Sequence, residues 1–155
     1  MPELIAQQTA QNLHGATATD EDIHLLRSSI GPGLIPDWLA AMLRKNRPAG
    51  VCFALAAGDD VSGLGADLLW LTPAQIVSEA IECQPGLSVV SAGFIPIGGC
   101  AEGSGDPYFL DMQEGSNDPP LVRVPHDFAV VKPYPLDRVE LVSETLSAFF
   151  AKASF

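Results

Sequence analysis

The chain has 155 residues, of which 47% are hydrophobic and 17% are charged. That size and composition predict one domain with its own core and exclude a disordered chain. With 19 acidic and 8 basic residues, the net charge of -11 would repel nucleic acid and anionic membrane surfaces and attract a basic protein. We therefore expect a protein partner, no nucleic acid and no membrane.

Cysteine usage and the N-terminal sequence predict a cytoplasmic protein. Cys52, Cys83 and Cys100 are odd in number and far apart, with no CxxC pair, so we expect neither a structural zinc site nor a redox motif. Free thiols suit a reducing compartment. The first residues show no basic region followed by a long apolar run, and no apolar stretch is long enough to span a bilayer, so we expect no signal peptide and no membrane span.

The first third of the chain predicts helices. Residues 1–18 predict only a weak helix or a partly ordered arm, and a single domain spans 19–155. Thr19 and Asp22 have capping-box spacing before a run of apolar residues on one helical face. A second helix has Pro36 at its first position. Its buried stripe consists of Trp38, Leu39, Met42 and Leu43.

The apolar period then changes to that of strands. Runs at 51–56 and 67–71 predict two strands. Residues 72–75 have the pattern of a helix start, with Thr at the N-cap, Pro next and Gln in the capping-box position. A long apolar run at 88–97 predicts a further strand, in which Pro96 should lie at an end or an edge because it lacks an N–H group.

The last third alternates as strands do and ends in a helix. Residues 107–112 predict a strand, with Tyr108, Leu110 and Met112 on one face and Phe109 and Asp111 on the other. Residues 121–124 predict another strand, and 130–131 a short one. A helix is expected from about Ser143. Its apolar face would consist of Val142, Leu146, Phe149 and Phe150.

Together these elements predict an α+β fold. N-terminal helices precede a largely antiparallel sheet of about five or six strands, and a C-terminal amphipathic helix packs on the sheet. Antiparallel pairing is expected because the strands follow one another too closely for helical crossovers.

Several short blocks follow one another in a recognisable order. A helix ending near Gly33 leads through an Ile-Pro step into a second helix, and an apolar strand leads into a helix at Thr72. The best block is Phe94 to Gly98, then Gly-Ser-Gly-Asp, Tyr-Phe-Leu-Asp and later His-Asp. In the order of these blocks along the chain, the sequence resembles the SUKH superfamily over roughly residues 20–152. The motif residues are Pro36, Trp38, Gly98, Gly103, Gly105, Asp106, Tyr108, Asp111 and His126.

The resemblance implies an antiparallel sheet packed by helices and a role in binding. Bacterial members are typically immunity proteins, which implies a non-catalytic protein-binding module that neutralises a toxin domain with a basic surface. The superfamily also includes yeast cell-wall assembly regulators, so a regulatory scaffold with several weak partners is the alternative. The chain departs from the pattern at 46–50, where the family has an Asn-Gly-Gly-like turn, and residues 1–18 lie outside it.

Acidic residues in the predicted connections form either a partner-binding surface or an ordinary solvated surface. If they share one edge of the sheet, their pairing with a basic partner would speed association and set specificity. They lack the ligand spacing of an HExxH or EF-hand site, so we expect no metal. The candidates are Asp59, Asp60, Glu102, Asp106, Asp118 and Asp127.

Two motifs bear on catalysis. The segment from Gly103 to Asp106 has no third glycine and joins strand to strand, so we interpret it as a tight turn with Asp106 bonding its backbone and expect no cofactor. Cys100, His126 and Asp127 would be the residues of a small Cys/His hydrolase. However, Cys100 is not at a helix N-terminus, and adjacent residues of a strand point to opposite faces, so we expect no enzyme.

Overall fold

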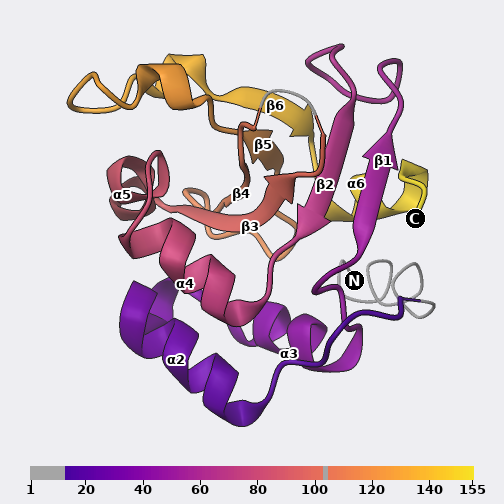
Figure 1. The fold of residues 1–155 in the computed structure, drawn as a ribbon, viewed down its shortest axis with the longest axis vertical. Coiled ribbons are helices and arrows are strands. Elements are labelled where there is room, and N and C mark those ends of the chain that lie inside the picture. The colour runs from indigo at the N-terminus through magenta and orange to yellow at the C-terminus, as the bar shows by residue number, and fades with distance from the viewer. Residues whose placement is uncertain (1–12, 103–104) are drawn as a thin grey trace.

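The structure, a computed structural model, describes residues 13–102 and 105–155. Six strands form one curled antiparallel sheet in the order β1-β2-β3-β4-β5-β6, so each strand pairs with its neighbours along the chain (Figure 1). The predicted antiparallel pairing is thereby confirmed. The strands are β1 (Cys52–Leu55), β2 (Ala66–Trp70), β3 (Phe94–Cys100), β4 (Tyr108–Asp111), β5 (Leu121–Arg123) and β6 (Glu140–Ser143).

Five α-helices surround this sheet within the described residues. In Figure 1, α2, α3 and α4 lie together at one end of the molecule, and α6 lies behind β1 and β2. The predicted α+β class is confirmed, with a helix after the last strand. None of these helices is long and apolar enough to cross a bilayer. They are α2 (Asp20–Ile30), α3 (Asp37–Lys45), α4 (Pro73–Ile81), α5 (Gly86–Val89) and α6 (Leu146–Lys152).

Two capping boxes start helices where the sequence predicts them. The Thr19 hydroxyl accepts the Asp22 N–H at 3.1 Å, and the Asp22 carboxylate accepts the Thr19 N–H at 2.8 Å. Thr72 and Gln75 make the same reciprocal pair at the start of α4. Pro36 is the N-cap of α3 rather than its first residue. Each box satisfies backbone donors at the first turn, which fixes where the helix begins.

The strand predicted at 88–97 is wrong in its first half. Gly86–Val89 form α5, Val90–Ala92 form a 3-10 turn, and β3 begins only at Phe94. Gly93, with a φ of 103°, makes the turn between them. A short apolar run fits a buried helix as well as a buried strand, so its period could not separate the two.

Pro96 lies inside β3, which is an internal strand, so it is neither at a strand end nor in an edge strand as predicted. It pairs with Phe109 of β4 and lies beyond the last pair between β2 and β3, which joins Trp70 to Gly98. Only one side of Pro96 therefore borders a paired strand. At Gly98 a Cβ would approach the Leu68 Cγ to 2.5 Å, so the buried Leu68 side chain of β2 fills the space that a side chain there would need.

Two C-terminal predictions are also wrong. Val142 lies in β6, and α6 begins only after Thr145, whose hydroxyl accepts the Ala148 N–H at 3.0 Å. The apolar spacing crosses the junction between strand and helix, so Val142 and α6 share a core without sharing a helix. Val130 and Val131 form no strand and are exposed in a turn.

Both faces of the sheet are covered by apolar residues. The alternation predicted for β4 is confirmed, because Tyr108 and Leu110 lie in the main core, with Met112 packed against it, whereas Phe109 lies in a second cluster. The main core takes in α2, α3 and α6. The second cluster consists of Val89, Phe94, Phe109, Val122, Val124 and Tyr134.

The outer strands of the sheet are tied to other parts of the chain. In the connection between β1 and β2, which we call loop 56–65, the Val61 N–H donates to the Val142 carbonyl of β6 at 3.0 Å. On the open side of β1, Ala54 and Ser154 exchange two backbone hydrogen bonds of 2.9 Å. The loop therefore closes the curled sheet, and the C-terminal segment covers the centre of β1.

Residues 13–18 differ from the predicted weak helix or arm. They are extended and packed on the domain, with Ala16 in a β-bridge to Ala49 and Leu13 only 2% exposed. The prediction for residues 1–12 falls outside the described residues.

Candidate binding pocket

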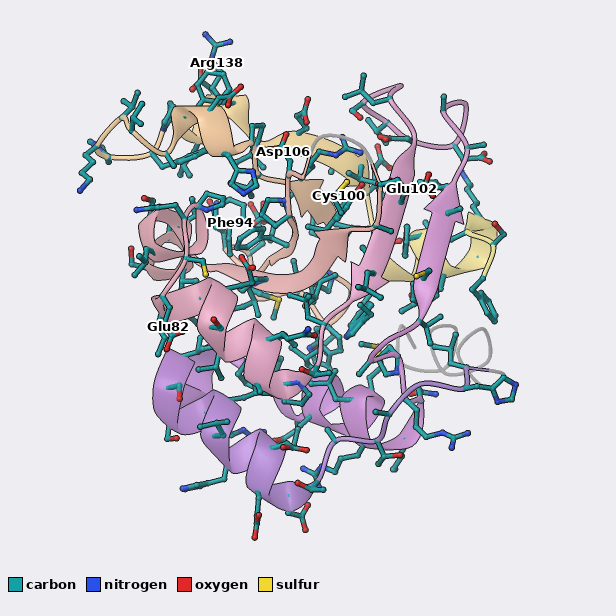
Figure 2. The ribbon with its side chains drawn as sticks, in the orientation of Figure 1. Glu82, Phe94, Cys100, Glu102, Asp106 and Arg138 are labelled. Atoms are coloured by element: carbon teal, nitrogen blue, oxygen red, sulfur yellow. The ribbon has the colours of Figure 1, made fainter. Side chains whose placement is uncertain are left out.

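The ends of five strands meet at a pocket of about 620 Å³. The start of β2, the end of β3, the start of β4, the end of β5 and the start of β6 lie together because successive antiparallel strands reverse direction. Figure 2 shows Cys100, Glu102 and Asp106 on this side of the molecule. The lining residues are Leu64, Gly65, Ala66, Asp67, Cys100, Glu102, Asp106, Tyr108, Arg123, Pro125, Phe128 and Glu140.

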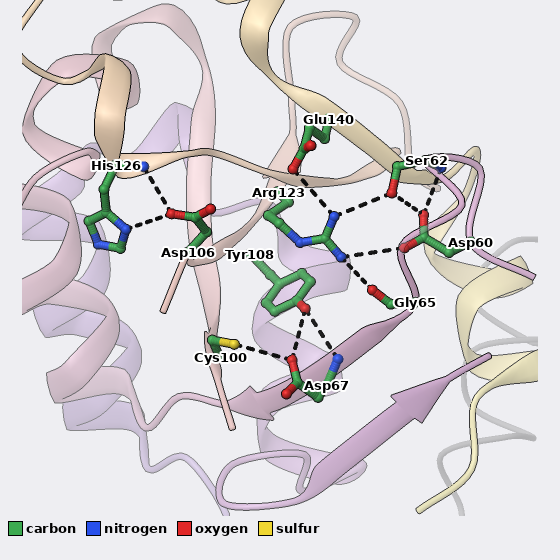
Figure 3. A network of polar contacts seen from close by, with 10 residues as sticks. All are labelled: Asp60, Ser62, Gly65, Asp67, Cys100, Asp106, Tyr108, Arg123, His126 and Glu140. Atoms are coloured by element: carbon green, nitrogen blue, oxygen red, sulfur yellow. Dashed lines mark hydrogen bonds and ion pairs between the residues drawn. The ribbon is translucent and has the colours of Figure 1, made fainter. Parts of the chain in front are cut away.

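Arg123, at the end of β5, is the centre of a polar network in this pocket (Figure 3). The residue is 5% exposed. Its Nη2 donates to the Gly65 carbonyl at 2.7 Å and to Asp60 Oδ2 at 3.3 Å. Its Nη1 donates to Ser62 Oγ at 3.3 Å and to Glu140 Oε1 at 3.4 Å. Three of these four partners belong to loop 56–65, so Arg123 ties that loop to β5.

The surroundings of Arg123 favour its charged form. Burial opposes the charge, but Tyr108 and Asp60 outweigh burial and raise the pKa of Arg123 above its ordinary value. The guanidinium carbon lies 5.2 Å from the centroid of the Tyr108 ring, within the range of a cation–π contact. The Asp60 side chain is fully buried. The charge of Arg123 is therefore already engaged inside the protein.

Asp67, at the start of β2, is a second polar centre. The Tyr108 hydroxyl donates to its Oδ1 at 3.3 Å, and the Cys100 thiol donates to the same oxygen at 3.2 Å. The Glu102 N–H donates to Oδ2 at 2.7 Å. These bonds join β2 to the ends of β3 and β4 and hold one wall of the pocket.

Asp106 and His126 hold the opposite wall. Asp106 Oδ1 accepts the His126 N–H at 3.0 Å and lies 2.8 Å from His126 Nδ1. Nearby, the Tyr134 hydroxyl donates to the Pro125 carbonyl at 2.7 Å. Burial and then the Asp106 carboxylate raise the pKa of Tyr134 to about 12, so the hydroxyl remains a donor at neutral pH. Residues 126–138, which we call segment 126–138, are thereby pinned to the sheet.

The environment of Cys100 disfavours a nucleophilic thiolate. Burial raises the pKa of the Cys100 thiol, and the Asp67 carboxylate, by hydrogen bond and by charge, raises it further. The thiol also contacts the Glu102 carbonyl. A reactive cysteine needs the opposite shift, since the thiolate is the nucleophile. In addition, His126 pairs with Asp106 and not with the adjacent Asp127 that the hydrolase hypothesis would use.

We expect iodoacetamide to alkylate Cys100 slowly at neutral pH, and more slowly than the exposed Cys52 of the same chain. Peptide mass spectrometry of one time course measures both rates, with Cys52 as the internal control. If Cys100 reacted faster than Cys52, the raised pKa would be contradicted and the hydrolase hypothesis favoured.

Apart from the buried Asp60, four of the six acidic candidates lie at the pocket or in the two segments that flank it. Glu102 and Asp106 line the pocket. Asp59 is exposed in loop 56–65, and Asp127 is exposed in segment 126–138. Residues far apart in the sequence are thus brought to one side of the sheet.

The other two candidates have structural contacts. The buried Asp60 carboxylate binds Arg123 and is not offered to a partner. Asp118 lies beyond the opposite end of β4, where its carboxylate accepts the Ser147 N–H of α6 at 2.9 Å. We leave both out of the candidate surface.

Three motif residues of the resemblance, Gly105, Asp111 and Trp38, lie in turns or against the main core. Gly105 has a φ of 79°, which favours glycine and fits the tight turn, whereas Gly103 falls outside the described residues. Asp111 Oδ1 accepts the Gln113 N–H at 3.1 Å in the turn after β4. Trp38 is half-buried against the main core.

Sequence reasoning missed Asp67, Arg123 and Glu140 as pocket residues. A signal was present for the first two, because Arg123 stands in Leu-Val-Arg-Val and Asp67 in Ala-Asp-Leu-Leu-Trp. A charged side chain in an apolar strand is almost never buried unless it is paired. The pattern therefore indicates a partner, although it does not name one.

The described residues contain no group of three or more His, Cys, Asp or Glu that could hold a metal ion. In comparisons with known proteins, no family model, no curated protein and no solved structure matches this chain. The SUKH resemblance therefore stays a prediction from the sequence.

Proposed function

We propose that this chain is a non-catalytic protein-binding module that takes a basic segment of a partner protein into its acidic pocket. One observation carries the proposal: the lining holds four carboxylates and a single guanidinium, which is already paired. A pocket of this sign attracts a cationic side chain and disfavours an anion. The net charge of -11 adds attraction at longer range.

Catalysis has less support from the same residues. Burial and Asp67 hold the pKa of Cys100 high, and the ring of His126 is engaged with Asp106. The guanidinium of Arg123 holds a loop of its own chain. A binding role requires none of these groups to react.

The biological role that we propose is that of an immunity protein acting on a toxin. The support is the SUKH resemblance, carried by the blocks at 94–98 and 108–111, together with the sign of the pocket. Many targets of that superfamily are nucleases, and a nuclease must offer a positive surface to bind phosphates. An acidic pocket would be complementary to such a surface and could occlude it.

The test is capture of a partner from the native host at low and high salt, followed by affinity measurement on the purified pair. We expect one stoichiometric partner with a basic surface, bound more weakly at high salt. Glu102→Lys reverses the charge of an exposed pocket residue and should lower the affinity at least about tenfold.

Glu114→Lys is the matched control for this variant. It makes the same charge change at an exposed residue in the turn after β4, at the other end of that strand from Asp106. It should change the affinity by less than about threefold. Equal partner affinity of the two variants would rule out the pocket as the binding site. Capture of several weak partners in place of one tight partner would favour the regulatory scaffold.

A further inference from the structure

Large apolar side chains are exposed in the two segments that flank the acidic pocket, and one of them, Leu64, lines it. Nine large hydrophobic residues are exposed in the described part of the chain, and five of them lie in loop 56–65 and segment 126–138. Those two segments hold 10 and 13 of the 155 residues, so the exposed apolar residues are concentrated there. They are Val61 (56% exposed), Leu64 (66%), Val130 (85%), Val131 (48%) and Leu136 (43%).

The two segments form rims on either side of the pocket. Leu64 of loop 56–65 and Phe128 of segment 126–138 both line it. In Figure 1 the loop between β1 and β2 and the segment between β5 and β6 both lie at the top of the view, opposite the end that holds α2 and α3. Figure 2 places Asp106 and Glu102 on that side as well. The surface therefore has an acidic centre and apolar margins.

Both rims are anchored before any partner arrives. Arg123 holds loop 56–65 through bonds to Gly65, Ser62 and Asp60. The other rim is held by the contact of His126 with Asp106 and by the Tyr134 hydroxyl. Ordered rims lose little conformational entropy on binding, so most of the free energy from burying their apolar groups is available for affinity.

We propose that the two rims belong to the same interface as the pocket, and that the segment they fit carries a lysine or arginine between apolar side chains. The cation enters the carboxylate-lined pocket, and its apolar neighbours cover Leu64 on one rim and Val130 on the other. This inference rests on the proposed function and names the chemistry of its partner. Charge pairing mainly speeds association and sets specificity, whereas burial of apolar area supplies affinity.

A random peptide display library, selected on the full chain at physiological salt, tests the inference without a known partner. We expect enrichment of peptides in which a basic residue has apolar residues on both sides. Leu64→Ser and Val130→Ser should each weaken the selected peptide about tenfold, measured by calorimetry. Both side chains are exposed, so the variants should fold. Leu25→Ser, at an exposed apolar residue of α2 away from the pocket, is the control and should bind as the wild type does.

Other outcomes separate this inference from the proposed function. The selected peptides could be basic but lack apolar neighbours, and their binding could be weakened by Glu102→Lys and not by the serine variants. That result would contradict a role for the rims and would still support the acidic pocket as the binding site. Selection of apolar peptides whose affinity is unchanged by Glu102→Lys would contradict both this inference and the proposed function. Failure to enrich any peptide would overturn the inference, because the surface would then not accept a linear segment of this chemistry.

Discussion

Replacement of Arg123 by alanine is expected to lower the free energy of unfolding by about 3–5 kcal/mol, because it removes one partner of a buried ion pair. The Asp60 carboxylate would remain fully buried without its counter-charge, and the Gly65 carbonyl would lose its donor. Urea unfolding followed by circular dichroism measures the loss.

Arg44→Ala is the matched control for this prediction. Arg44 makes an ion pair of 3.1 Å with Asp20 in which the two side chains are 42% and 90% exposed. Exposed pairs contribute about 1 kcal/mol or less, so this variant should unfold almost as the wild type does. Similar losses in both variants would mean that the network around Arg123 does not hold loop 56–65.

The second large effect is expected at Phe53, the centre of the aromatic cluster in the main core. Its ring lies between 5.6 and 6.3 Å from the rings of Trp70, Phe149, Phe150 and Phe155. It joins β1 and β2 to α6 and is only 2% exposed. Phe53→Ala should cost about 3–5 kcal/mol, since it leaves a cavity among rings that cannot close around it.

Phe155→Ala makes the same change at the solvent-exposed edge of the aromatic cluster. Phe155 is 56% exposed, so less apolar area is lost and the cost should be about 1 kcal/mol or less. Thermal and urea unfolding of the two variants compares them directly. A loss at Phe53 no larger than that at Phe155 would show that the cluster does not join α6 to the sheet.

Local chemistry made much of the fold predictable from the sequence. The capping boxes at Thr19 and Thr72 involve residues three apart, and the alternation in β4 needs only neighbours in the strand. The predictions failed where one pattern fits two structures. The apolar run at 88–97 fits a helix or a strand, and the spacing of Val142 with α6 continues across the junction between β6 and the helix.

The site was harder to predict because its bonds join distant parts of the chain. Asp60 and Arg123 are 63 residues apart, and Asp106 and His126 are 20 apart. The sequence supplied the acidic residues and placed most of them in connections, but it could not say that Asp60 turns inward while Glu102 remains exposed. That difference depends on the curl of the sheet, which brings loop 56–65 over the end of β5.

The ties on the outer strands also bear on how the molecule behaves among copies of itself. An open sheet presents unpaired N–H and C=O groups at its two margins, and such margins can template stacking into aggregates. Here β1 has four residues and is bridged at its centre by Ser154, and β6 gives the Val142 carbonyl to Val61. The charge of -11 adds mutual repulsion. We therefore expect the short, hydrogen-bonded edge strands and the like charge to disfavour aggregation of this chain through its sheet.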